Sequence, residues 1–486
     1  MEILTGYAII AIYGLLLVGI RYLIQRKFAA NAQTIRQFIF AGGNISFGLL
    51  APSIFVSWLW VTTVIGAAEA GVRYGISGSW AYSLGAAAAF CLLIPLIRAI
   101  RAKTPTSATF LEYTAQRFSP LLRDVYYLFA ILLTIYLVVA QAAGIALVFN
   151  GLFAVSFKKI AFSAVIIAGC YVVVTGMRGV LFNELVNFFL ISIGLSFFFV
   201  IIIQHFPLPL LHEGMLAVEH EITNPNYNPN SLRLFSKAGT LYGLSAVVIA
   251  LGQICVDPAY YLKAYIAKDG PTMTRSFLAG GVLAWIPVPI ISAFVLGYVA
   301  LSQNLDFSTA TNISINLSTT ILSRYFGAPT EILFAVLIFC IGMTSIIHCL
   351  VGMQAIFTLD FYQRKIDPAA DEAARMKFGK TVTLLLALLC ALIAISLEKI
   401  SLLTIDTFSG IFFAAPCSTI IVGLLSRRPF KQIALIAVVA GILAGLATWI
   451  WVNDDSVNWL YATLASFVTP IIVLLIFPPL TRKSTT

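Results

Sequence analysis

The chain has 486 residues, of which 60% are hydrophobic and only 10% are charged, and its mean hydropathy is +0.97. Soluble globular proteins carry about 25% charged residues, so this composition excludes a soluble enzyme or binding module and predicts an integral membrane protein. The net charge of +10 is explained by the topology derived below and gives no reason to expect a nucleic-acid partner.

Hydrophobic stretches long enough to cross a bilayer as helices recur along the whole chain. Thirteen are expected, which makes the fold class an all-α polytopic membrane protein. The stretch at 326–361 is longer than one crossing needs, so it must tilt or project from the membrane. The expected spans are residues 3–24, 44–70, 77–99, 122–152, 157–177, 183–204, 238–266, 276–302, 326–361, 380–397, 401–425, 431–451 and 457–479.

The basic residues test this count and orient the chain. If the spans alternate from an N-terminus outside the cell, the inward loops carry 22 Lys and Arg residues and the outward loops carry seven. Because cytoplasmic loops are enriched in Lys and Arg, the sequence predicts an outside N-terminus and an inside C-terminus in the cell (plasma or inner) membrane. The outward residues are Arg73, Lys158, Lys159, Arg233, Lys237, Arg324 and Lys399.

Motifs of enzyme and metal chemistry do not occur in the sequence. The seven cysteines lie inside expected spans without CxxC spacing, and they are interpreted as small apolar packing residues. Without a nucleophile elbow, phosphate loop or HExxH motif, neither an enzyme nor an organic cofactor is expected. The first span is followed by Arg26 and Lys27 and has no basic start, so we expect an uncleaved anchor rather than a signal peptide.

An outward loop at 205–237, rich in asparagine and proline near its end, divides the chain. Five spans precede it once the N-terminal span is set aside, and five follow it through residue 425. Because five is odd, the second set enters the membrane in the opposite orientation, as in an inverted repeat. The expected organisation is an extra N-terminal helix with an inner loop (1–37), a first five-helix repeat (38–204), the loop (205–237), a second repeat (238–428), and two C-terminal helices with a short cytoplasmic tail (429–486).

In transporters built from inverted repeats, substrate and ions bind near the bilayer midplane, where a helix of each repeat is interrupted. The first repeat offers Ala51-Pro52-Ser53 followed by Val56-Ser57-Trp58-Leu59-Trp60, and the second offers the segment from Gly252 to Pro258. Proline removes a helical donor and frees a carbonyl, so both repeats contain a candidate break.

Two adjacent hydroxyls, Thr344 and Ser345, lie inside the apolar segment 331–362. On a helix they share one face with Ile341, His348 and Gly352. Hydrocarbon offers a hydroxyl no solvent, so each needs a partner. They either bond to the carbonyl one turn earlier or serve as oxygen ligands of a hard cation such as Na⁺.

Three groups of residues occur in an order and spacing that together are specific. They are Thr104-Pro105-Thr106 with Phe110-Leu111-Glu112-Tyr113 and Arg117-Phe118, Tyr171 with Thr175 to Val180 and Asn183 to Val186, and Phe357 to Tyr362 after Thr344-Ser345. This pattern resembles the sodium:solute symporter family over residues 38–428. The resemblance implies a LeuT-type fold of two inverted five-helix repeats, commonly with thirteen spans.

The resemblance also implies a sodium site, placed by counting back from Asp360 and by aligning residues 74–78. Five uncharged oxygens suit Na⁺ better than Ca²⁺. Glu184 stands where the family has an acidic residue near the inner end of the ion path, with a paired or solvated residue as the alternative. The implied ligands are the carbonyls of Val56, Leu59 and Ile341 and the hydroxyls of Thr344 and Ser345.

Residues at the two breaks are the candidate substrate contacts. Trp58 and Trp60 can supply a flat apolar wall, with simple packing as the alternative. Asp257 is a carboxylate within a span, where an unpaired charge is costly and indicates function; it could bind a donor-rich solute, pair with Lys263 or cap the break. The further candidates are Gln253, Tyr260 and Ser409, and Asp406 could join Ser409 in an outer gate, although loop capping is its expected role.

The residues at both breaks resemble the urea-transporter branch of the family. That branch carries Trp-x-Trp and Val-Asp-x-x-Tyr-Trp where this chain has Trp58-Leu59-Trp60 and Val256 to Tyr261. The match is partial, because Tyr261 replaces the tryptophan, Lys263 replaces the usual arginine and Pro258 resembles the proline-transporter branch. The expected function is sodium-coupled symport of a small polar solute, with urea or a related small amide as the first hypothesis.

Three alternatives remain open from the sequence. The solute could be proline, another amino acid or a monocarboxylate. The coupling ion could be a proton, because His348 shares the face of the hydroxyl pair and imidazole titrates near neutral pH. An alternative of another class is a solute-sensing membrane module that acts on a separate kinase.

Overall fold

The computed structural model describes residues 2–28, 34–107, 109–306, 313–398, 402–453 and 457–477. Across these ranges the protein is helical and contains no strand, only an isolated bridge between Ile45 and Ala267. Three π-helical segments, Ala279–Leu283, Ala293–Tyr298 and Ile356–Ile366, interrupt or extend the α-helices. The α-helices are α1 (Glu2–Phe28), α2 (Ile35–Phe38), α3 (Phe47–Trp58), α4 (Val61–Lys103), α5 (Leu111–Arg117), α6 (Pro120–Phe153), α7 (Phe157–His205), α8 (Leu208–His220), α9 (Lys237–Cys255), α10 (Pro258–Ile266), α11 (Gly270–Leu278), α12 (Pro287–Ser292), α13 (Val299–Ser302), α14 (Ile313–Tyr325), α15 (Ala328–Ala355), α16 (Glu372–Ala394), α17 (Leu402–Leu425), α18 (Ile433–Trp451) and α19 (Asn458–Ile476).

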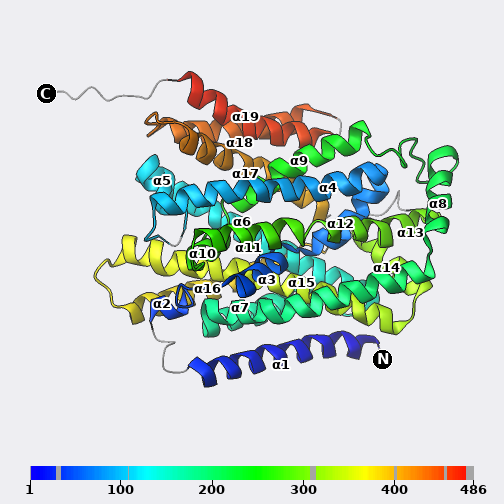
Figure 1. The fold of residues 1–486 in the computed structure, drawn as a ribbon, viewed down its shortest axis with the longest axis horizontal. Helices are drawn as coiled ribbons and strands as arrows, with labels where there is room; N and C mark the ends of the chain where they lie inside the picture. Colours follow the sequence, from blue (N-terminus) through cyan, green and yellow to red (C-terminus); the bar gives the residue numbers. More distant parts are fainter. Residues whose placement is uncertain are drawn as a thin grey trace.

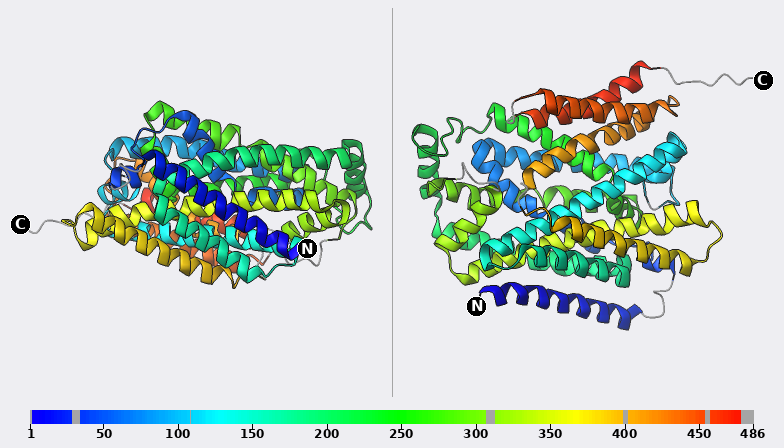
Figure 2. Two further views of the ribbon diagram at one scale, coloured as in Figure 1. Left: turned by 90° about the horizontal axis from the view of Figure 1, so that it is seen from below. Right: turned by 180° about the vertical axis from the view of Figure 1, so that it is seen from behind.

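The long helices run side by side in one bundle (Figure 1). Helix α1 lies along one edge beside α7, and α18 and α19 lie along the opposite edge (Figures 1 and 2). The short helix α8 crosses one end of the bundle. Helix α15 is almost entirely buried and packs against both α6 and α7. Residues carried by α15 are therefore enclosed by protein rather than lipid.

Two of the helices are long enough for two crossings. Among the described residues, eleven helices are long and apolar enough to span a membrane, and of these α4 has 43 residues and α7 has 49. One crossing needs about 20 residues. Each helix contains one glycine with non-helical backbone, Gly75 with φ 64° and Gly176 with φ 61°. Dividing α4 and α7 there brings the eleven helices to thirteen segments, while the number of membrane crossings and the orientation stay predictions.

The chain reverses direction at Gly75. A Cβ atom on Gly78 would lie 2.6 Å from the carbonyl oxygen of Ala70, whereas eight residues of straight helix rise about 12 Å. The turn is held by the loop after α8, because the Ile76 amide donates to the Ser231 carbonyl at 2.9 Å. Glycine is required at position 75 for two reasons: its φ is left-handed, and the Ser231 backbone lies so close that it leaves no room for a Cβ atom.

Both expected helix breaks are present. The first lies at Leu59–Trp60, between α3 and α4, and the second at Val256–Asp257, between α9 and α10. The first break falls at the end of the expected segment 51–60, seven residues beyond Pro52, which lies inside α3. The start of α3 and the end of α10, which lie away from the two breaks, are joined, since the Ile45 amide donates to the Ile266 carbonyl at 2.9 Å.

We predict that Gly75→Ala prevents stable folding of the protein. The added Cβ would lie 2.3 Å from the Ser231 carbonyl oxygen, in addition to the roughly 1–2 kcal/mol that a left-handed backbone costs other residues. Thermal unfolding in detergent would measure this loss. Gly43→Ala is the matched control, because Gly43 has φ 72° but open space around an added Cβ. Equal melting temperatures for the two variants would contradict the turn.

Candidate functional site

The break between α3 and α4 diverts two backbone amides from their helical partners. The Trp60 amide donates to the Thr63 hydroxyl at 3.0 Å, and the Thr63 amide donates to the Trp60 carbonyl at 2.9 Å. In a continuous helix these amides would pair with the carbonyls of Val56 and Leu59. Both carbonyls are thereby released, inside a fully buried part of the protein.

Ser345 of α15 lies against the released carbonyl of Leu59. Its hydroxyl oxygen is 3.0 Å from the Leu59 carbonyl oxygen and 3.2 Å from the Ile341 carbonyl oxygen. Three of the five oxygens named from the sequence thus converge from two helices. Their chemistry fits a hard monovalent cation, because all three are uncharged oxygens.

Thr344 is held by a different set of contacts. Its hydroxyl donates to the Cys340 carbonyl at 2.8 Å and accepts a hydrogen bond from the Asn187 amide at 2.6 Å. Both hydroxyls therefore bond to the carbonyl one turn earlier, which was one of the two interpretations of the sequence. Ser345 also reaches the neighbouring helix break, as the other interpretation requires.

A cluster of ionisable side chains lies close to these hydroxyls. Lys263 of α10 and Glu184 of α7 form an ion pair with 2.7 Å between Nζ and Oε1, and both side chains are 0% exposed. The Ser53 hydroxyl of α3 donates to Glu184 at 2.5 Å, and its carbonyl accepts from Lys263 at 3.2 Å. Glu184 is therefore paired rather than solvated, and the pair joins α3, α7 and α10.

His348 lies between the two carboxylates of this cluster. Its Nε2 is 3.4 Å from Asp257 Oδ2 and its Nδ1 is 3.9 Å from Glu184 Oε1. Neither ring nitrogen has a hydrogen-bond partner within the described ranges, and the Tyr260 ring is 4.6 Å away. Two carboxylates and one ammonium leave a net charge of −1 while the imidazole is neutral. Protonation of His348 would neutralise the cluster.

Asp257 does not pair with Lys263. Its Oδ1 accepts the Ala259 amide at 2.8 Å, which caps α10. Lys263 is one and a half turns further along α10 and points to α7 instead. Of the three roles that the sequence left open for Asp257, the cap is the one that the structure shows.

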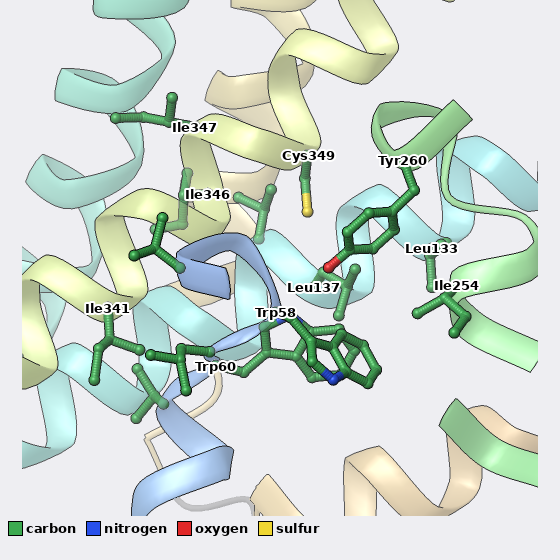
Figure 3. Packing of buried hydrophobic residues seen from close by; sticks show 14 of the residues in the cluster. Trp58, Trp60, Leu133, Leu137, Ile254, Tyr260, Ile341, Ile346, Ile347 and Cys349 are labelled. Carbon is green, nitrogen blue, oxygen red and sulfur yellow. The ribbon is translucent and has the colours of Figure 1, made fainter. Parts of the chain in front are cut away.

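An aromatic pocket opens on the other side of the first break. The Trp58 ring is 5.0 Å from the Trp60 ring and 5.7 Å from the Trp285 ring. Figure 3 shows Trp58 and Trp60 side by side at the break, with Tyr260 pointing toward them. Trp58 Nε1 is buried and has no hydrogen-bond partner in the described parts of the chain. The pocket is lined by Trp58, Trp60, Thr63, Tyr82, Ala86, Tyr242, Ala246, Ile249, Ala250, Gln253, Trp285, Asp406 and Thr407.

The polar wall of this pocket is built around Asp406 of α17. Its carboxylate accepts hydrogen bonds from the Tyr136 hydroxyl and from Gln253 Nε2, the latter at 3.0 Å. Gln253 also donates to the Ser409 hydroxyl at 2.7 Å. The expectation that Asp406 caps a loop was therefore wrong, because Asp406 lies within α17 and faces α6 and α9.

The structure divides the predicted substrate residues into two groups. Trp58, Trp60 and Gln253 line the aromatic pocket and Ser409 supports Gln253, whereas Asp257 and Tyr260 lie beside His348. The sequence did not indicate that Tyr136 and Trp285 contribute to this pocket, and it indicated only a gate or a loop cap for Asp406. One signal for Asp406 was present, since it is a carboxylate within an apolar span, the same signal that indicated Asp257.

Residues 38–441 match the model of the Sodium:solute symporter family. The chain belongs to this family. Its members are transporters rather than enzymes, so this protein is a multi-pass membrane transporter. The family match begins after α1, which therefore lies outside the shared region.

Relatives and solved structures agree with the family assignment. The chain is 21% identical over 473 residues to the urea-proton symporter DUR3 of Oryza sativa subsp. japonica, covering 92% of this chain and 65% of that protein. It is 22% identical over 468 residues to a probable urea active transporter of Schizosaccharomyces pombe, covering 92% and 70%. A Na⁺-coupled sialic acid symporter shares the fold, with a TM-score of 0.77 at 16% identity over 98% of both chains. The expected LeuT-type helical fold is thereby confirmed.

We predict that the buried ion pair is a strongly coupled unit. Glu184→Gln and Lys263→Met should each lower the free energy of unfolding by about 3–5 kcal/mol, because each leaves one buried charge without its partner. The double variant should lose clearly less free energy of unfolding than the two single variants lose together. Denaturant titration of the unchanged protein, the two single variants and the double variant measures the free energies of this double-mutant cycle.

The half-exposed pair of Lys365 and Asp124 is the control for this cycle. Lys365→Met should change stability by no more than about 1 kcal/mol, since exposed pairs contribute little. Additive losses for the Glu184 and Lys263 variants would show that the two charges are not coupled.

Proposed function

We propose that this protein is a sodium-coupled symporter that imports a small neutral amide, with urea as the first candidate. Residues 38–204 and 238–428 are proposed as its two inverted repeats, because each range contains one of the two broken helices. The observation that carries the substrate proposal is the chemistry of the aromatic pocket, which is lined by three tryptophans and Asp406 and includes Trp58, whose buried Nε1 has no hydrogen-bond partner among the described residues.

Urea matches these three features. It is planar, it has two N–H₂ groups that need acceptors, and its carbonyl oxygen needs a donor. Asp406 supplies the acceptor, Trp58 Nε1 supplies the donor, and the rings of Trp60 and Trp285 can cover the flat faces. A monocarboxylate fits poorly, because its negative charge would face Asp406 in a site of low dielectric constant.

The cation site and the pocket share one backbone segment. Leu59, whose carbonyl contacts Ser345, lies between Trp58 and Trp60, which line the pocket. A Na⁺ ion held by Val56, Leu59, Ile341, Thr344 and Ser345 would fix this segment and with it the pocket wall. Each positive charge moved inward contributes about 2.3 kcal/mol per 100 mV, which supports accumulation of the solute.

We predict that Ser345→Ala abolishes sodium-stimulated uptake. The variant removes the oxygen that bridges α15 and the first break, so a Na⁺ gradient should stimulate urea uptake into proteoliposomes at least tenfold less than in the unchanged protein. Ser418→Ala is the control, because Ser418 is a buried hydroxyl whose one hydrogen bond among the described residues goes to the Ala415 carbonyl of its own helix. Normal sodium stimulation in Ser345→Ala would reject this cation site.

Proton coupling is the second candidate, and the charge of the buried cluster favours it. His348 faces Asp257 and Glu184 in a cluster with one negative charge in excess, and the rice relative is a urea-proton symporter. Uptake driven by an inward proton gradient without Na⁺, and lost in His348→Gln, would favour this candidate. Uptake that needs Na⁺ and ignores the proton gradient would favour the first.

We predict that Asp406→Asn raises the KM for urea by about 10- to 100-fold. Losing a hydrogen bond to a charged group costs about 1.5–3 kcal/mol, and each 1.4 kcal/mol is tenfold in affinity. Labelled-urea uptake at varied concentration measures KM. Asp367→Asn, in the loop before α16, is the control and should leave KM unchanged. An unaltered KM in Asp406→Asn would remove Asp406 from the substrate site.

A further inference from the structure

Helix α1 precedes the region that matches the family, so the family match assigns it no role. One face of α1 is buried against α6 and α7, and the rest is exposed. Among the described residues of α1, Tyr13 is the polar side chain on this buried face, and it is 5% exposed. The other buried side chains are aliphatic: Ile9, Ile10, Leu17 and Ile20.

Tyr13 is linked to the candidate cation site by hydrogen bonds. Asn187 of α7 donates to the Tyr13 hydroxyl at 2.8 Å and to the Thr344 hydroxyl at 2.6 Å. The Tyr13 hydroxyl in turn donates to Asn183 Oδ1 at 3.3 Å. The Tyr13 ring also packs edge-on against Phe339 of α15, with 5.2 Å between the ring centroids.

The number of donors and acceptors on each group fixes which atom donates in the hydrogen bonds among Tyr13, Asn187 and Thr344. A primary amide has two N–H donors, and those of Asn187 go to Tyr13 and Thr344. The Thr344 proton is used by the Cys340 carbonyl at 2.8 Å. A hydroxyl oxygen has two lone pairs, and Asn187 occupies one of them. One lone pair of Thr344 therefore remains, with its direction set by Asn187.

We propose that Tyr13 is a positioning residue, through which α1 holds Asn187 and so orients the hydroxyl of Thr344 toward the coupling cation. The Asn187 Oδ1 atom is buried and without a hydrogen-bond partner among the described residues, so the two donated bonds are what orients this amide. Removing the Tyr13 hydroxyl frees one of its N–H groups and lets the amide rotate. This inference rests on the proposed cation site.

The test is Tyr13→Phe, which removes only the hydroxyl. We expect the half-saturating Na⁺ concentration for urea uptake to rise 3- to 10-fold, with an unchanged KM for urea at saturating Na⁺. Tyr22→Phe, a 62% exposed tyrosine of the same helix, should behave like the unchanged protein. Stabilisation of the purified protein by Na⁺ in thermal unfolding gives a second measurement that does not depend on transport.

Asn187→Ala completes the experiment. It should raise the half-saturating Na⁺ concentration further, and adding Tyr13→Phe to it should change nothing more, because Tyr13 acts through Asn187. An unchanged sodium dependence in folded Tyr13→Phe would overturn the inference, as would equal losses of affinity for Na⁺ and urea. Thr344→Ala separates the two proposals: if it retains normal sodium dependence, the cation site itself is wrong and the role of Tyr13 falls with it.

Discussion

A backbone carbonyl inside a membrane protein must find a partner, because hydrocarbon supplies none. The break at Leu59–Trp60 creates this need at the centre of the bundle, where the amides that would pair with Val56 and Leu59 are engaged elsewhere. The groups that meet the need come from other parts of the bundle. Ser345 contacts the Leu59 carbonyl, and the indole of Trp285 donates to the Trp58 carbonyl at 2.9 Å. The candidate cation site and the aromatic pocket are both consequences of this single interruption.

The second break is tied to the first by charge. Lys263 follows the second break, Ser53 precedes the first, and both meet at Glu184. A buried ion pair is costly to form and more costly to split, so this contact holds α3, α7 and α10 together in the structure. Movement of α3 relative to α7 and α10 would have to break it or carry it along. The location of His348 beside it offers one way in which a proton could change that balance.

The relatives show how far the fold extends beyond sequence similarity. At 16% identity the chain shares its fold with a sialic acid symporter along nearly the whole length. Sialic acid is a bulky acidic sugar, whereas the pocket here is aromatic and presents Asp406. The two chains therefore share the helical fold, while the aromatic side chains and Asp406 at the first break belong to this chain's own sequence.

Much of this arrangement is local in sequence and could be predicted. Apolar stretches, the basic loops and the proximity of Thr344 and Ser345 on one helix face depend on residues that are near each other in the chain. The second break was also locally visible, because Asp257 and Pro258 form a helix start. The first was predicted to involve Pro52, but proline at that position is accommodated inside α3, and the interruption follows seven residues later.

Only the tertiary structure decided which distant side chains meet. The sequence offered Lys263 a nearby partner in Asp257, yet the ammonium pairs with Glu184, 79 residues away. Asp406 became part of a pocket because α17 packs beside α6 and α9, and Tyr13 is linked to Thr344 through Asn187 of α7. Helices and breaks follow from local hydropathy and backbone chemistry, whereas a buried polar group is satisfied by whichever helix packs against it, and that packing depends on the whole bundle.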